Sequence, residues 1–350
     1  MRAIALIALL AILSEVAHAQ APVASCANTP LPARCLLDLA QRESQRVTAP
    51  SARYQALAKL LNAAATAALS LPVTAESAAR AIEANFLDDA NRLDLLMALQ
   101  NYRTRFPESG AETRLAALAL YLGLAENGVG SARLSLMLTA CGVLELPEPL
   151  ATQWQPMVDH GCTPAFLDET TLPGDTDRLM GILLAPIVFY REDEAEAFEA
   201  AVDRAHATVR DMDGQMEDKP DATRAAWQQL KAGMYLLHGA SFADFGDLLR
   251  TRLSAAASYA AVLAAEEIGG IVLAEERASV AALLMRAEQR STAEQILDET
   301  TQLIDDDPGH QRVPAAGRVG FLTALVELLA GEAESLFCPE PDAADSQPAV

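Results

Sequence analysis

The stretch SFADFGDLLRTRLSAAASYAAVLAAEE, residues 241–267, decides the fold predicted for this chain. Ser241, with Asp244 three residues later, is a variant of the capping box that begins helices, and Gly269-Gly270 provides a stop. Apolar side chains recur between them at three- and four-residue steps: Phe242, Phe245, Leu249, Leu253, Ala256, Ala260 and Leu263. We therefore expect one long helix whose apolar face lies against a core. From Ser254 to Ala265 most of the remaining side chains are small as well, so we expect neighbouring helices to pack closely around this helix.

Helical periodicity continues through most of the remaining chain, and we find no convincing run of alternating strand residues. The sequence predicts an all-α protein of antiparallel helix pairs, stacked as a repeat-like α-solenoid array in two halves. The predicted N-terminal half covers residues 20–142 and the C-terminal half covers residues 176–337. Five prolines between residues 143 and 175 are typical of a connector. The polar, Pro-rich tail, residues 338–350, is predicted to be disordered.

The helix pair predicted over residues 271–308 resembles a tetratricopeptide (TPR) repeat. Its small and apolar residues stand at the Leu-Gly-x-x-Tyr and Ala-x-x-x-Phe positions of that family: Val280, Ala281 and Leu284, then Ala293 and Leu297. The sequence departs from the family at Arg277, which replaces Trp, at Thr300, which replaces a small residue, and at Pro308, which comes late. The TPR-like resemblance implies a concave protein-binding groove and supplies no catalytic residues.

An export signal is predicted at the start of the chain. Arg2 precedes an apolar run from Ala3 to Leu13, and Ala17-His18-Ala19 fits a signal-peptidase site. Residues 1–19 are therefore read as a signal peptide cleaved after Ala19, and the product as periplasmic or secreted. A run this short falls below the ~20 residues that span a bilayer, so no membrane span is expected after cleavage. A lipidated Cys26, after Val23-Ala24-Ser25, is the alternative.

Five cysteines lie beyond this signal, and an oxidising compartment favours disulfides. Because short loops close at a lower entropic cost, we expect Cys26 to pair with Cys35 and Cys141 with Cys162. Cys338 is then the odd cysteine. A bond from Cys338 to Cys26, which would tie the ends of an array, is the alternative.

The net charge of the chain argues against polyanionic partners. A formal net charge of −22 opposes binding to nucleic acid and to anionic lipid surfaces. A protein or peptide partner is therefore the expectation, and the oligomeric state is left open.

The sequence contains no convincing catalytic or metal-binding motif. No two histidines are spaced as ligands on one helical face, and neither Gly-x-Ser-x-Gly nor Ser-x-x-Lys occurs. The stretch 159–162, DHGC, contains metal-ligand types, but a disulfide beside an incidental histidine is the favoured reading. The acidic stretches 211–214 and 305–309 fail the spacing of a calcium loop and are read as helix ends. We expect no cofactor, no metal site and no catalytic residues.

These observations favour a protein- or peptide-binding scaffold over an enzyme. One alternative is a hydrolase acting on envelope polymers through two carboxylates, which any acidic chain could supply. Another is a carrier that holds an apolar ligand among the helices around Tyr259 and Leu263. Exposed aromatic residues on a concave face, with Tyr102, Trp154 and Trp227 as candidates, would favour partner binding.

Overall fold

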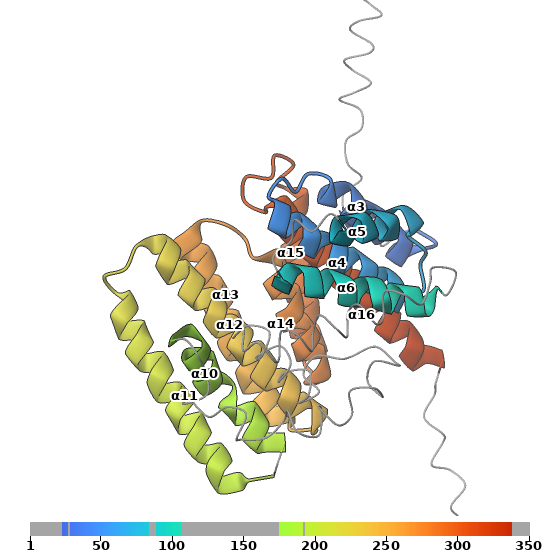
Figure 1. Ribbon diagram of the computed structural model, residues 1–350. Helices are drawn as coiled ribbons and strands as arrows, with labels where there is room; N and C mark the ends of the chain where they lie inside the picture. The colour runs from blue at the N-terminus through green and yellow to red at the C-terminus, as the bar shows by residue number, and fades with distance from the viewer. Residues whose placement is uncertain (1–22, 27–28, 84–88, 107–174, 192, 338–350) are drawn as a thin grey trace, which may run out of the picture.

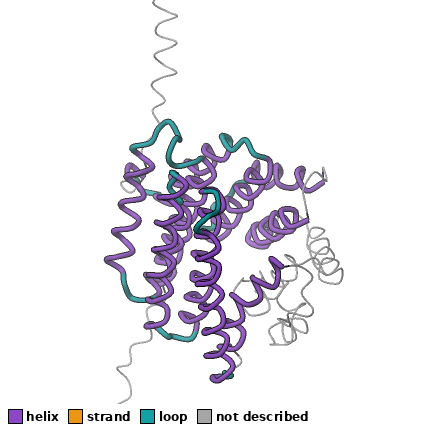
Figure 2. The backbone as a smooth tube through the Cα atoms, turned by 90° about the vertical axis from the view of Figure 1, so that its left-hand side faces the viewer, coloured by secondary structure: helices purple, strands orange, loops and turns teal. Residues whose placement is uncertain are grey.

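The computed structural model describes residues 23–26, 29–83, 89–106, 175–191 and 193–337, and all regular secondary structure in these ranges is helical (Figures 1 and 2). The all-α class predicted from periodicity is therefore confirmed for the described residues. Cys141, Cys162, Trp154, Cys338, the connector and the signal peptide lie outside them. The helices are α2 (Val23–Cys26), α3 (Pro32–Ser44), α4 (Pro50–Thr66), α5 (Pro72–Glu83), α6 (Asp89–Arg105), α10 (Asp175–Arg191), α11 (Ala195–Met216), α12 (Asp221–Asp244), α13 (Leu248–Gly269), α14 (Ala274–Arg286), α15 (Arg290–Asp305) and α16 (Ala315–Phe337).

The largest hydrophobic cluster joins helices from both ends of the chain. The C-terminal helix α16 packs against α3 and α4, and α6 lies on α4 (Figure 1). Phe321 of α16 is fully buried there beside Leu37 of α3 and Leu60 of α4, all members of that cluster. The N-terminal helices are therefore held in place by α16, the last helix that the structure describes.

A cysteine pair and two hydrogen bonds fix the first described residues against the neighbouring helices. Cys26 and Cys35 lie at bonding distance, with their Cα atoms 5.5 Å apart, which is the local pairing expected from the sequence. The Asp305 carboxylate at the end of α15 accepts the backbone N–H of Val23 at 2.7 Å and that of Ala24 at 3.3 Å. Short helix α2 is thus capped by a residue from the far end of the sequence.

The predicted long helix over residues 241–267 is in fact two helices. Helix α12 continues to Asp244, and Gly246 then adopts a left-handed conformation with φ +74°. The Asp247 carboxylate caps α13 by accepting the backbone N–H of Arg250 at 3.0 Å. Ser241 is buried inside α12 and caps nothing, so the predicted capping box is wrong. The predicted stop is correct, because α13 ends at Gly269 and Gly270 is left-handed.

Phe242 of the predicted apolar stripe is buried, but the part of the stripe that lies on α13 does not face the core. On α13, Leu249 is 68% exposed, Leu253 63% and Leu263 40%. We call Leu249, Leu253, Ala256, Ala260 and Leu263 the outer stripe of α13. The face of α13 toward α12 is built from small residues instead, among them Thr251, Ser254, Ser258 and Ala261, all buried.

Small side chains explain which face of α13 turns inward. The Ser258 hydroxyl donates to the carbonyl oxygen of Ala232 on α12 at 2.9 Å. A Cβ atom placed on Gly239 of α12 would lie 3.1 Å from Cβ of Ser254. Because the two backbones approach this closely, a leucine does not fit between them, and the large apolar side chains of α13 lie on its outside.

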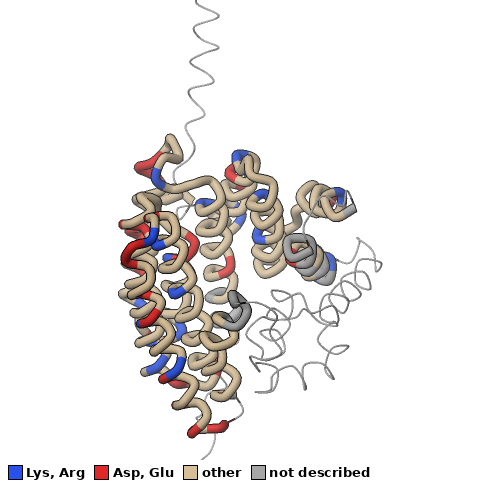
Figure 3. The backbone as a smooth tube through the Cα atoms, turned by 60° about the vertical axis from the view of Figure 1, so that its left-hand side comes forward, with Lys and Arg blue, Asp and Glu red and all other residues tan. Residues whose placement is uncertain are grey.

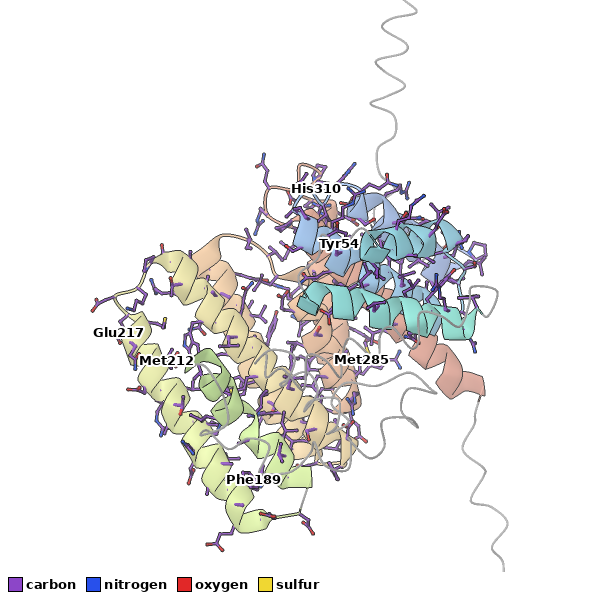
Figure 4. The ribbon with its side chains drawn as sticks, viewed as in Figure 1. Tyr54, Phe189, Met212, Glu217, Met285 and His310 are labelled. Atoms are coloured by element: carbon purple, nitrogen blue, oxygen red, sulfur yellow. A yellow bond between two sulfur atoms is a disulfide. The ribbon has the colours of Figure 1, made fainter. Side chains whose placement is uncertain are left out.

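Helices α10 and α11 extend this side of the molecule, at the lower left of Figure 1. Asp213 of α11 accepts the indole N–H of Trp227 at 2.7 Å and is paired with Lys231 at 3.0 Å, both on α12. Met212 packs on the hydrophobic cluster to which Trp227 belongs (Figure 4). Pro186 lies within α10 without ending it.

Helices α14 and α15, the pair that resembles a TPR repeat, lie in contact as predicted. Arg277, which stands at the Trp position of that family, is buried on α14 and donates through Nε to the Glu266 carboxylate of α13 at 2.8 Å. Their ion pair joins α13 to α14. None of the helices within the described ranges has both the length and the hydropathy needed to cross a bilayer.

Candidate functional site

An open cleft lies between α11, α12 and α13. Its volume is about 340 Å³, and most of the surface that lines it is apolar. Helix α11 supplies one wall, α12 the floor and α13 the opposite wall; the residues that matter below are Phe198, Glu199, Val202, His206, Tyr235, His238, Phe242, Arg250 and Leu253. The size matches the lower end of the range for clefts that hold small ligands or single side chains of a partner.

Aromatic rings close one end of this cleft. The Tyr190 ring of α10 lies 5.1 Å from that of Phe198, 4.9 Å from that of Phe242 and 5.4 Å from that of Phe245 (centroid distances). The contacts of Tyr190 with Phe242 and Phe245 are edge-to-face, an arrangement that the ring quadrupoles favour. The rings come from α10, α11 and the α12–α13 turn, so this cluster fixes the relative positions of the cleft walls.

Arg250 lies over the aromatic cluster. Its guanidinium carbon is 4.7 Å from the centre of the Phe198 ring and 5.9 Å from that of Phe242. Its Nη2 pairs with the Glu199 carboxylate at 3.0 Å, and its Nε lies 3.7 Å from Asp247. The positive charge is therefore balanced by two carboxylates and a ring face.

His238 is the buried ionisable group of the floor. Its Nε2 lies 2.6 Å from the carbonyl oxygen of Leu183, so we assign the proton to Nε2, which donates to that oxygen. Burial lowers the pKa of His238 to about 4, with a smaller lowering from His206, against an opposing contribution from the bond to Leu183. The imidazole is therefore neutral at neutral pH.

The hydroxyl of Tyr190 is likewise fixed as a protonated hydrogen-bond donor. Its hydroxyl donates to the Asp247 carboxylate at 3.3 Å. Burial, and then the charge of Asp247, raise the pKa of Tyr190, which keeps the hydroxyl protonated. Tyr190, His238 and Arg250 are thus each engaged by the protein itself. A molecule that enters the cleft is met chiefly by apolar surface.

The outer stripe of α13 continues from the cleft along the surface. Leu253 belongs to both, because it lines the cleft and is still largely exposed. The exposed apolar surface is therefore continuous from the aromatic cluster to Leu263. Extended apolar patches on a soluble protein mark interaction sites more often than isolated exposed leucines do.

The acidic stretches considered for calcium bind the protein's own groups. Asp213 is engaged by Trp227 and Lys231, and Asp305 caps α2. Asp307 accepts backbone N–H groups of Gln311, Arg312 and Val313 at 2.8–3.0 Å; these bonds outweigh the effect of burial and lower its pKa to about 2. No cluster of three or more His, Cys, Asp or Glu suited to a metal ion occurs among the described residues.

Two further sets of residues were singled out in the sequence: aromatic residues expected on the surface, and Tyr259 with Leu263, expected around an apolar ligand. Tyr102 and Trp227 are buried, so neither is a surface aromatic. Tyr259 is partly buried with its ring 5.9 Å from the Arg277 guanidinium, and it packs on the cluster between α12, α13 and α14. Leu263 lies on the outer stripe.

A group of carboxylates bears on the hydrolase alternative. Glu275 of α14 pairs with Lys59 of α4, and burial raises the pKa of the adjacent Glu276. The pKa of Glu327 on α16 is raised to about 7, first by desolvation and then by Glu275, although its side chain reaches the surface. None of these carboxylates lines the cleft. We therefore place the candidate site at the cleft and rest no catalytic role on this group.

The residues that build the cleft were missed in the sequence. Phe198, Val202 and Ala205 do recur at helical spacing, and aromatic residues are dense from Phe189 to Tyr259. That density was the available signal. Which of the rings meet could not be foreseen, because Tyr190 contacts Phe242 across 52 residues of sequence.

Together these features define an all-α protein with an open apolar cleft between three helices. Comparison with models of protein families, with curated proteins and with solved structures finds no match.

Proposed function

We propose that this chain is an exported helical scaffold that binds a protein or peptide partner through the cleft and the outer stripe of α13. The observation that carries the proposal is the continuity of the two surfaces at Leu253. A small ligand would occupy only the cleft, whereas a polypeptide could cover both the cleft and the outer stripe of α13.

The energetics support a macromolecular partner. Burying a leucine side chain contributes about 2 kcal/mol, so covering Leu249, Leu253 and Leu263 offsets part of the entropic cost of association. Tyr190, His238 and Arg250 are already paired within the protein, which leaves His206 and Tyr235 as the polar rings of the lining that a partner could meet. Complementary apolar shape, with few new hydrogen bonds, is then the basis of recognition.

The scaffold and its compartment belong to the same proposal. Helix pairs such as α14 and α15 are proposed to form a repeat-like, TPR-like array that presents the cleft at one side. The signal-like first nineteen residues and the Cys26–Cys35 pair support a periplasmic or secreted location. The net charge of −22 supports a protein partner over nucleic acid.

Selection from a random peptide library displayed on phage tests this function. The target is the chain from Gln20 onward with its disulfides intact. We expect enriched peptides to bind the wild type and to lose at least about tenfold in affinity for the Leu249→Gln, Leu253→Gln double variant. Leu329→Gln on α16 is the matched control, because it removes an exposed leucine elsewhere. Peptides that bind all three proteins equally, or a library that enriches nothing, would contradict the proposal.

A further inference from the structure

We infer that the partner segment is a basic amphipathic helix, which lays its apolar face along the outer stripe of α13 and sets its Lys or Arg residues against the acidic wall of α11. This inference rests on the proposed function and adds the shape and the charge of the partner.

The spacing of the outer stripe points to a helix as the partner. Its five residues, Leu249 to Leu263, follow one another at steps of four, three, four and three. That is the spacing of a coiled-coil seam, in which the apolar side chains of a facing helix interdigitate. Ala256 and Ala260 in the middle permit close approach of that helix. The stripe is about 21 Å long, which a partner helix of about 14 residues would match.

The wall beside the stripe determines the charge of the partner. Glu196, Glu199 and Asp203 lie at three- and four-residue steps on α11, so they share one face of that helix, and Glu199 of this face lines the cleft. Glu196 and Asp203 are exposed, and Glu199 is the ion-pair partner of Arg250. Figure 3 shows the Asp and Glu positions of the described helices in red and the Lys and Arg positions in blue.

Nearby positive charges leave this wall negative. Arg250 lies between Glu199 and Asp247, so these three side chains together carry one negative charge. Residues 193–218, which span α11 and its two ends, contain nine acidic and two basic residues, a balance of −7 (2 − 9), and Lys231 of α12 offsets one of these charges by pairing with Asp213. Arg210 follows two turns beyond Asp203 and does not reverse that balance. Lys or Arg residues on the partner would therefore be attracted to the wall.

The same charges disfavour a second copy of the chain as the occupant. Each copy would bring a net charge of −22 and the same acidic α11. Like charges brought together at an interface cost free energy and slow association. An anionic lipid surface is disfavoured for the same reason.

Three synthetic peptides test the inference. Each has about 18 residues with leucines at alternating four- and three-residue steps; the flanking positions are Lys in the first, Gln in the second and Glu in the third. At about 0.05 M salt we expect the Lys peptide to bind at least about tenfold more tightly than the Glu peptide, with the Gln peptide between them. At about 0.5 M salt the ratio should fall to about twofold, because surface charges are then screened.

Matched variants locate the effect. Glu196→Gln with Asp203→Asn should weaken the Lys peptide about three- to tenfold and leave the Gln peptide unchanged. Glu217→Gln with Asp218→Asn removes the same charge from the far end of α11, where Figure 4 shows Glu217, and should have little effect. The Leu249→Gln, Leu253→Gln variant should bind none of the three peptides. This result would distinguish binding to the outer stripe of α13 from nonspecific electrostatic attraction to an acidic protein.

The outcomes separate the inference from the proposed function. Equal binding of all three peptides, lost in the leucine variant, would overturn the basic partner and leave the binding function standing. Micromolar self-association of the wild type in sedimentation, abolished in the leucine variant, would assign the stripe to a second copy and overturn the inference. Failure of the peptides and of the displayed library together would overturn both. A Lys peptide that binds the leucine variant as well as the wild type would also overturn the inference.

Discussion

The guanidinium carbon of Arg250 on α13 lies 4.7 Å from the centre of the Phe198 ring on α11, so one side chain spans the cleft between its two walls. The same guanidinium pairs with Glu199 at 3.0 Å. This contact holds the acidic wall beside the outer stripe, and the geometry of the site depends on it.

Arg250→Ala should therefore loosen α11 from α13. We expect a loss of about 1–2 kcal/mol in the free energy of unfolding in urea, because the cation–π contact and a partly exposed ion pair are removed together. Arg80→Ala, which breaks the exposed pair with Glu76 and an exposed 3.5 Å contact with the Ser77 hydroxyl, should cost less than about 0.5 kcal/mol. Equal losses in the two variants would show that the aromatic contact contributes nothing.

His238 should make stability depend on pH. Its pKa is lowered from 6.5 to about 4 in the folded protein, so between these values the unfolded chain binds more protons than the folded one. Stability is then fully present above about pH 6.5 and falls by about 3 kcal/mol as the pH drops to 4. In His238→Gln this part of the dependence should vanish in urea titrations across that range. A His238→Gln profile parallel to that of the wild type would refute the assignment.

Two glycines of α12 should respond in opposite ways to alanine. A Cβ on Gly239 would overlap Cδ2 of Leu283 and lie 3.1 Å from Cβ of Ser254, so we expect Gly239→Ala to lower the melting temperature and cost about 1–3 kcal/mol. Gly233 has no atom within 4 Å of such a Cβ, so Gly233→Ala should stabilise by about 0.5–1 kcal/mol. A stabilising Gly239→Ala would mean that the α12–α13 interface is looser than described.

The proposed export predicts which residue begins the processed chain. The Ala17-His18-Ala19 pattern places cleavage before Gln20, three residues ahead of the capped start of α2. Intact mass of protein recovered from the bacterial periplasm should match a chain that begins at Gln20, and non-reducing digestion should yield a Cys26–Cys35 peptide. A chain that begins at Cys26 would instead support lipidation.

Much of the fold could be predicted from the sequence where local rules agree. The pair α14 and α15 was placed by apolar periodicity, and the end of α13 by Gly269-Gly270. The break at Gly246-Asp247 was missed, although a glycine followed by Asp is the expected signal for the end of one helix and the cap of the next. The apolar residues keep their three- and four-residue spacing from Phe245 to Leu249, across the break, so periodicity alone predicted one continuous helix.

The candidate site could not be predicted because periodicity does not say which way a stripe points. Leu249 and Leu253 form an apolar face that would normally be assigned to the core. The direction was decided by Ser254, Ser258 and Gly239, which admit only a close helix contact on the other side. Closeness of packing between two helices is a tertiary property, and no spacing rule within one helix contains it.

The most direct test of the central claim is to watch the leucine methyl groups of α13 while a partner binds. In methyl NMR spectra of the ¹³C-labelled protein, addition of the Lys peptide should shift the resonances of Leu249, Leu253 and Leu263 and leave those of Leu329 in place. Shifts confined to other leucines, with these three unchanged at saturating peptide, would contradict the account.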